Sequence, residues 1–195
     1  CQLANVTLHA CPTNDTWARD HGFITVTDGK VIRLLDFRFN GWGDKFEAGL
    51  DNAINRSLYI NKVVMGEYID HNDFVLEGGS IESDGQGTVL TTSQCLLAPH
   101  RNQPLSREDI ELKLKDYLGA DRILWIDYGH LEGDDTDGHI DTLVRTAPDN
   151  TLLYVRCTDK QDSHYADLHL MEEQLKTFRT ADGRPYRLLP LPMPR

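Results

Sequence analysis

The 195-residue sequence contains few cysteines, no long apolar run and no excess of basic residues. The four cysteines lack Cys-x-x-Cys or Cys/His spacing, which excludes a zinc-finger type of site. No apolar stretch approaches the ~20 residues that span a bilayer, so we expect no membrane partner. Acidic residues outnumber basic ones, 31 to 20, for a formal net charge of −11. Since no basic footprint is present, nucleic acid is not an expected partner either.

The cysteines are Cys1, Cys11, Cys95 and Cys157. Reduced thiols in a cytoplasmic protein are the default expectation for so few, although Cys1 and Cys11 could pair in an oxidising compartment. Because the sequence begins at Cys1 rather than at Met, we expect a processed form or a piece of a longer protein.

One polar signature recurs three times, at nearly equal intervals. It places a carboxylate beside glycine just before a β-rich run, at Asp20, at Glu77 and at Asp137. Strands and helices follow in the order ββαβ each time, so a period of roughly 60 residues indicates repeated supersecondary units. We predict one partial domain over residues 1–195, with units at about 17–75, 76–135 and 136–195.

The predicted elements follow hydrophobic periodicity and turn chemistry. In the first unit, residues 23–27 and 31–35 form a hairpin, and a helix presents Phe46, Leu50, Ile54 and Leu58 on one face. In the second, strands at 80–83 and 88–91 precede a helix that begins at Ser106 and ends at Gly119. In the third, we predict strands at 140–145 and 151–155 and a helix over 168–178. We expect three such units to be part of a ring whose closure needs further chain.

Convergence of the repeated acids would create a site for a strongly cationic group. A planar guanidinium is matched by bidentate carboxylates, and an indole such as Trp17 would wall it on one side. His139 and Asp141 form a further pair whose side chains share one side if the segment is a strand. The carboxylate would then raise the pKa of the imidazole and favour its protonated form, which could protonate a leaving amine. Alternatively, Asp141 grips the substrate while His139 transfers the proton.

Less specific interpretations also fit these residues. A histidine on a strand is usually structural, and Glu-Gly-Gly is also a tight turn. The acidic loop Asp134–Asp137 is either solvated or a calcium-type cluster, though it lacks the EF-hand spacing.

Together, the motifs resemble the agmatine deiminase and bacterial peptidylarginine deiminase-like family. The resemblance rests on Trp17–Gly22, Asp36–Gly43, Glu77–Gly79, Thr92–Leu97 with Arg101-Asn102, and Asp135–Asp141, in the family order. It implies the pentein fold, an α/β propeller of five ββαβ units, of which about three are present. It also implies hydrolysis of a guanidino to a ureido group with release of ammonia, without metal or organic cofactor.

The resemblance also implies roles for particular residues. His139 would be the general acid/base, Asp20 and Asp141 would hold the guanidinium nitrogens, and Glu77 would line the same site. Trp17 and Asp135 would contact the substrate. A cysteine thiolate would attack the guanidinium carbon, giving a thiouronium intermediate that water hydrolyses.

The sequence departs from the family at the nucleophile. The family nucleophile lies in a C-terminal Gly-rich His-Cys motif that is absent here, and neither Cys95 nor Cys157 matches it. We therefore expect the central part of a deiminase, inactive by itself, whose exposed edges favour association, for example as a homodimer.

Several functions remain open from the sequence. The leading one is conversion of agmatine to N-carbamoylputrescine and ammonia in putrescine biosynthesis, because Asp135 suits the amine tail of agmatine. Peptidylarginine deimination needs an open cleft instead. A non-catalytic guanidinium- or polyamine-binding module would explain the missing cysteine but not His139 and Asp141, and metal binding would rest on the acidic loop alone.

Overall fold

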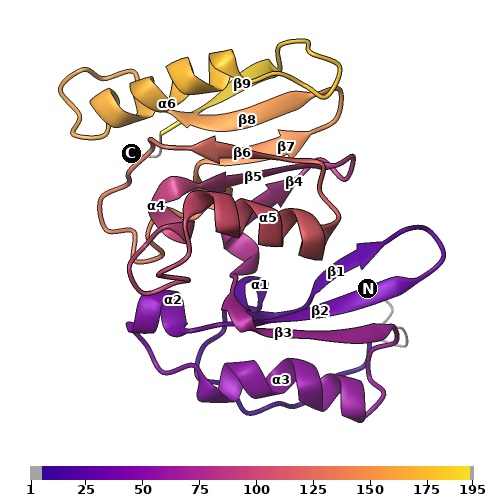
Figure 1. The fold of residues 1–195 in the computed structure, drawn as a ribbon. Helices are drawn as coiled ribbons and strands as arrows, with labels where there is room; N and C mark the ends of the chain where they lie inside the picture. The colour runs from indigo at the N-terminus through magenta and orange to yellow at the C-terminus, as the bar shows by residue number, and fades with distance from the viewer. Residues whose placement is uncertain (1–5, 194–195) are drawn as a thin grey trace.

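A computed structural model describes residues 6–193 and contains three three-stranded sheets of the same topology (Figure 1). In the first sheet, β1 (Ile24–Thr27) pairs antiparallel with β2 (Ile32–Arg38), which pairs parallel with β3 (Glu67–Val75). The connection between the parallel strands contains α3 (Gly49–Ile60). This unit has the predicted ββαβ order.

The other two sheets repeat this order. The second contains β4 (Ile81–Ser83), β5 (Thr88–Thr92) and β6 (Arg122–Ile126), with α4 (Ser93–Leu96) and α5 (Arg107–Leu118) in the crossover. The third contains β7 (Val144–Ala147), β8 (Thr151–Arg156) and β9 (Arg187–Pro192), with α6 (Tyr165–Thr177) in the crossover. The sheets follow one another through the molecule in chain order (Figure 1).

Local side-chain chemistry explains why the elements begin and end where they do. Asp28 Oδ1 accepts hydrogen bonds from the backbone N–H groups of Lys30 and Val31 and so closes the first hairpin. Helix α5 begins at a capping box between Ser106 and Asp109 and ends at Gly119, whose φ of 65° is left-handed. The Ser106 and Gly119 predictions are therefore confirmed.

Neighbouring sheets share their hydrophobic cores. Leu35, Phe37 and Phe74 of the first unit pack with Ile110 and Leu114 of α5. A second core joins the second and third units, and its residues include Leu90, Ile126, Leu152, Leu168, Met171 and Leu175. Because each core spans two units, the turns that connect the sheets are held against a packed interior.

The predicted apolar face of α3 is wrong. Phe46 precedes the helix, and Phe46 and Leu50 are 51% and 45% exposed, whereas Asp51 and Asn55 are buried. Asp51 Oδ1 accepts hydrogen bonds from Thr13 Oγ1 and from nearby backbone N–H groups. The side chain of Asn55 donates to His21 O and to Asp36 Oδ1. Polar anchoring therefore decides which side of α3 faces inward.

The predicted strand over 140–145 is also wrong at its start. Ile140–Thr142 is a 3₁₀ turn, η3, and β7 begins only at Val144. Thr142 Oγ1 donates to His139 O, and Leu143 N–H donates to Ile140 O, which closes the turn. The strand period thus does not place His139 and Asp141 side by side.

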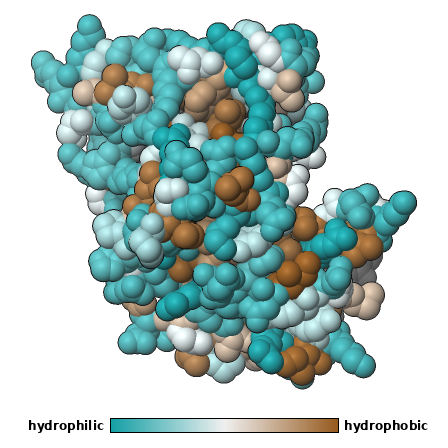
Figure 2. Space-filling view, in the orientation of Figure 1, coloured by the Kyte–Doolittle hydropathy of each residue, from teal (hydrophilic) through white to brown (hydrophobic). Residues whose placement is uncertain are grey.

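Over residues 6–193, none of the helices combines the length and the apolar character needed to cross a bilayer. Figure 2 shows a mainly hydrophilic face with separate apolar patches.

Candidate active site

A cavity of about 490 Å³ lies where the turns that precede the first strands of the sheets approach one another. Helix α1 (Ala18–His21) contributes Arg19 and Asp20 to its wall, and the region of η3 contributes His139 and Asp141. The lining brings together five of the six residues selected from the sequence, namely Trp17, Asp20, Asp135, His139 and Asp141. The sixth, Glu77, is outside the lining.

Asp20 is buried and rigidly held. Its Oδ1 accepts a hydrogen bond from the Gly79 N–H, and its Oδ2 accepts one from Trp42 Nε1, both at 3.1 Å. Burial raises the pKa of Asp20, and these two hydrogen bonds offset part of that rise. An ionised Asp20 would therefore gain from a cation in the cavity, because burial has removed most of its water.

Gly79, in the 3₁₀ turn η2 (Gly78–Ser80), marks the point on which the site converges. A Cβ at this position would lie 2.5 Å from His139 Nδ1, 2.7 Å from Asp20 Oδ1 and 2.9 Å from Asp141 Oδ2. Three reactive groups thus surround one small volume, which only a residue without a side chain leaves free.

His139 is buried and neutral at pH 7. Its Nδ1 lies 3.6 Å from Asp20 Oδ1, beyond hydrogen-bond distance, and its buried Nε2 has no partner among the described residues. Burial, followed by the charge of Arg101, lowers the pKa of His139 to about 4. The predicted rise in this pKa is wrong, because loss of hydration and a nearby guanidinium outweigh the carboxylates.

Asp141 is better exposed than Asp20. Its Oδ2 lies 4.0 Å from Arg19 Nε, and the Asp141 side chain is 20% exposed. Burial raises the pKa of Asp141, while Arg19 and Arg145 partly counteract that rise. The contact with Arg19 is long enough to leave the carboxylate available to a ligand guanidinium.

Trp17 and Asp135 form the rim of the cavity. The Trp17 side chain is 63% exposed, and Asp15 Oδ1 fixes its turn by accepting from the Trp17 N–H. Asp135 is also exposed, and its backbone carbonyl accepts a hydrogen bond from Lys45 Nζ at 2.7 Å. Both side chains are therefore free to contact a ligand that projects out of the cavity.

Glu77 lies outside the cavity lining, against Arg101, a residue for which the sequence predicted no role. Its Oε1 is 2.9 Å from Arg101 Nε, and both side chains are fully buried. The Nε–H does not point at the oxygen, so the contact is an ion pair rather than a hydrogen bond. Burial raises the pKa of Glu77 to about 7 although Arg101 opposes the rise. The family motif contains Arg101-Asn102, but the sequence does not indicate that Arg101 pairs with Glu77.

Two groups of side chains could be considered for a metal ion. Glu77, Cys95 and His139 bring ligand atoms within 4.8 Å of one another, but the Arg101 guanidinium already supplies the positive charge there. In the acidic loop, Asp134 accepts from backbone N–H groups, and Asp137 is paired with Lys45 and Arg101. In both groups, the carboxylates already bind Arg101, Lys45 or backbone N–H groups, which a metal ion would have to displace.

None of the described cysteines lines the cavity. Cys95 is fully buried in the first core, and burial raises the pKa of its thiol well above the usual value. Cys157 is buried in the second core, and Cys11 is half-buried. Cys1 lies outside the described residues, so its predicted pairing with Cys11 stays a prediction.

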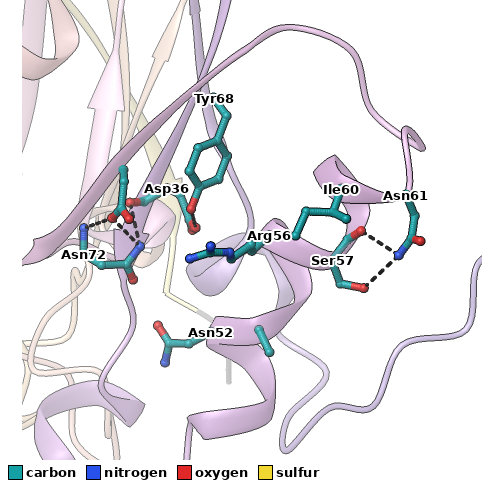
Figure 3. A pocket seen from close by; sticks show the side chains of 10 residues that line it. Asp36, Asn52, Arg56, Ser57, Ile60, Asn61, Tyr68 and Asn72 are labelled. Carbon is teal, nitrogen blue, oxygen red and sulfur yellow. Dashed lines mark hydrogen bonds between the residues drawn. The ribbon is translucent and has the colours of Figure 1, made fainter.

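A second cavity, of about 560 Å³, lies beside α3 and β3 (Figure 3). Its polar groups mostly bind one another: Asp36 accepts from Asn55 and Tyr68, and Asp70 accepts from Asn72. It contains no counterpart of the convergence seen at Gly79, so we take the first cavity as the candidate active site.

Comparison with known proteins relates the chain to deiminases. The chain is 37% identical to the agmatine deiminase of Pseudomonas putida over 97% of its own length and 52% of that protein. It superposes on a cysteine-to-serine variant of C. jejuni agmatine deiminase with substrate bound, with a TM-score of 0.90, 42% identity, and coverage of 100% of this chain and 56% of that one.

For the agmatine deiminase of Enterococcus faecalis, the TM-score is 0.87 at 34% identity, covering 94% of this chain and 51% of the other. The chain thus spans about half the length of the relatives it matches. It has the mixed α/β fold of these deiminase structures. The sequence profile of the Porphyromonas-type peptidyl-arginine deiminase family matches residues 1–195, and the chain belongs to that family.

Proposed function

We propose that this chain forms the guanidinium-binding part of a hydrolase that converts agmatine to N-carbamoylputrescine and ammonia. The observation that carries the proposal is the convergence of Asp20, Asp141 and His139 on the space above Gly79. Two carboxylates can each accept N–H groups of one guanidinium, while the exposed indole of Trp17 stacks on its face or on the methylene chain.

The neutral imidazole of His139 supplies the proton transfers. In the proposed reaction, a cysteine thiol gives its proton to His139 and its sulfur bonds to the guanidinium carbon. His139 then protonates one amino group, the C–N bond breaks, and ammonia leaves a thiouronium adduct. Water next attacks that carbon while His139 takes one of its protons, and the C–S bond then breaks. The departing thiolate takes that proton back from His139, and the ureido product loses its hydroxyl proton, through solvent, to the released ammonia, which becomes ammonium.

We propose that the nucleophilic cysteine comes from outside these 195 residues. The buried Cys95 is a poor thiolate, and Cys157 lies in the core of the third unit, not in the cavity. The relatives are almost twice as long, which leaves room for such a segment. The chain by itself should therefore bind guanidines without hydrolysing them.

The same proposal covers the wider architecture. Residues 1–195 would supply three units of a five-unit pentein ring as one partial domain, and the topology of the three sheets supports this. A cytoplasmic location, the lack of a metal or organic cofactor, and a homodimer stay predictions. Sedimentation of the full-length protein would measure the last of these.

Deimination of peptidylarginine is the second candidate, and the family name favours it. The two substrates differ beyond the guanidino group, since agmatine ends in an amine and a peptide does not. The exposed carboxylate of Asp135 on the rim suits the amine of agmatine. A non-catalytic guanidinium-binding module is the third candidate.

The test is an ammonia-release assay on the full-length gene product with agmatine and with an arginine-containing peptide. We expect ammonia and N-carbamoylputrescine in equal amounts from agmatine and little from the peptide. Preferred release from the peptide would select the second candidate, and no release from either substrate by a folded protein that binds agmatine would select the third.

A further inference from the structure

One buried guanidinium connects the segments that form the candidate site. The Arg101 side chain is fully buried and has three charged or polar partners. Its Nε lies 2.9 Å from Glu77 Oε1, its Nη1 donates to Asp137 Oδ2 at 2.9 Å, and its Nη2 donates to Thr136 O at 2.9 Å. The two Nη groups therefore donate hydrogen bonds, and the Nε side lies against a carboxylate as an ion pair.

The partners of Arg101 belong to two of the site-forming segments. Glu77 precedes the turn of Gly79, and Thr136 and Asp137 belong to the loop that runs from Asp135 to His139. The Thr136 hydroxyl in turn accepts a hydrogen bond from the His139 N–H at 3.0 Å. Two hydrogen bonds, both through Thr136, thus connect Arg101 to the backbone of His139, the proposed acid/base.

The third segment reaches Arg101 through a close packing contact. A Cβ at Gly43 would lie 2.4 Å from Arg101 Nη1, so the turn α2 (Gly41–Asp44) packs directly on the guanidinium. Trp42, in the same turn, donates its Nε1–H to Asp20. One side chain therefore supports the positions of Asp20, Asp135 and His139 together.

We propose that Arg101 is a positioning residue: its guanidinium sets the loop from Asp134 to Gly138 and thereby fixes His139 and Asp135 relative to Asp20. The proposal rests on the proposed function only in taking His139 as the reactive group. A lysine would keep the charge but could not bind Asp137, Thr136 and Glu77 at once, because an ammonium is a compact point charge without the spread of a guanidinium. Lys45, which also binds this loop, leaves the Glu77 side unsupported.

Arg101 also acts on His139 through its charge. Two cations surround His139, Arg101 and Arg19. The carboxylates near it are more numerous: Asp134, Asp137, Asp20, Glu77 and Asp141. Removing the Arg101 charge would leave mostly carboxylates around the imidazole, so Arg101→Gln should raise the pKa of His139. Arg101→Lys should change it less, yet still move the loop.

The experiment compares Arg101→Lys and Arg101→Gln in the full-length protein with the matched control Arg122→Lys. Arg122 also makes three contacts, to Thr88, to Arg179 O and to Tyr186, but none to the site. Histidine-labelled NMR follows the titration of His139, and the backbone amide signals of Thr136 and Gly138 report the loop. Agmatine turnover is measured in parallel, with kcat expected to fall about 100-fold in Arg101→Lys, because a small misplacement of reacting groups has that effect.

Since Arg101→Gln leaves Glu77 buried without a counter-charge, a second variant combines it with Glu77→Gln to restore folding. The proposal is supported if the Arg101 variants, folded, shift the loop amides and the His139 titration while Arg122→Lys does not. It is overturned if Arg101→Lys leaves both signals unchanged, or if Arg122→Lys shifts them equally. Absence of agmatine turnover in the wild type would refute the proposed function but not this inference, because the NMR comparison needs no turnover.

Discussion

His139 Nδ1 and Asp20 Oδ1 face each other at 3.6 Å although Asp20 lies in α1, before the first sheet, and His139 lies before η3, ahead of the third. At this distance the two groups do not share a hydrogen bond, and the nearby Gly79 leaves the space in front of them open. Because the pKa of His139 is also lowered to about 4, its neutral imidazole forms no ion pair with Asp20 at pH 7. A cationic ligand can meet the carboxylate without first breaking a salt bridge.

The first prediction concerns pH. The pKa of His139 is lowered to about 4 in the folded protein, against about 6.5 when unfolded, so between these values the unfolded state binds a proton that the folded state does not. The free energy of unfolding should consequently rise with pH across this window, by at most about 1.4 kcal/mol per pH unit, and level off above it. Urea denaturation of the full-length protein and of His139→Asn measures the difference. An identical pH slope in both proteins would mean that His139 is not buried and neutral.

The second prediction tests the convergence at Gly79. In Gly79→Ala the new methyl group would meet His139, Asp20 and Asp141, so we expect agmatine turnover to fall about 100-fold. Gly49→Ala is the control, because a Cβ at Gly49 contacts nothing within 4 Å. It lies at the start of α3 and should stabilise the protein by about 0.5–1 kcal/mol without changing turnover. Equal activity of the two variants would show that the reacting groups meet elsewhere.

The third prediction concerns the rim. Trp17→Ala should raise the KM for agmatine about 5- to 30-fold, because a cation–π contact contributes roughly 1–2 kcal/mol when partly desolvated. The melting temperature should hardly change, since Trp17 is already 63% exposed. Leu112→Ala, at a residue that is 66% exposed on α5, controls for loss of surface apolar area. An unchanged KM in Trp17→Ala would remove the indole from the binding site.

The parts of this structure that depend on neighbouring residues could be predicted from the sequence. The Ser106 cap and the left-handed Gly119 are examples, because each acts within one helical turn. The repeat of acid and glycine predicted that Asp20, Glu77 and Asp137 converge. Asp20 lines the cavity, whereas Glu77 and Asp137 lie outside the lining and meet at Arg101. Local chemistry and repetition therefore predicted the ββαβ order of the units and the ends of α5.

What depends on distant partners could not be predicted. Asp51 and Asn55 face inward because Thr13, His21 and Asp36 bind them, and no periodicity in α3 reveals those contacts. The protonation of His139 was missed for the same reason, since burial and Arg101 determine it. The apolar pattern of α3 does not reveal its buried polar face, and the His-x-Asp spacing does not reveal the protonation state of His139.

The most direct test of the account is the affinity for agmatine when both carboxylates are neutralised. Isothermal titration would use full-length protein carrying His139→Asn, so that substrate is not consumed, with and without Asp20→Asn and Asp141→Asn. Each charge-assisted contact contributes about 1.5–3 kcal/mol, so we expect the pair of changes to weaken binding at least about 100-fold. Glu82→Gln is the control, because Glu82 is buried but binds Thr146 and Arg145 outside the cavity, and it should leave the affinity unchanged. An unaltered Kd in the Asp20/Asp141 variant would contradict the assignment of this cavity as the guanidinium site.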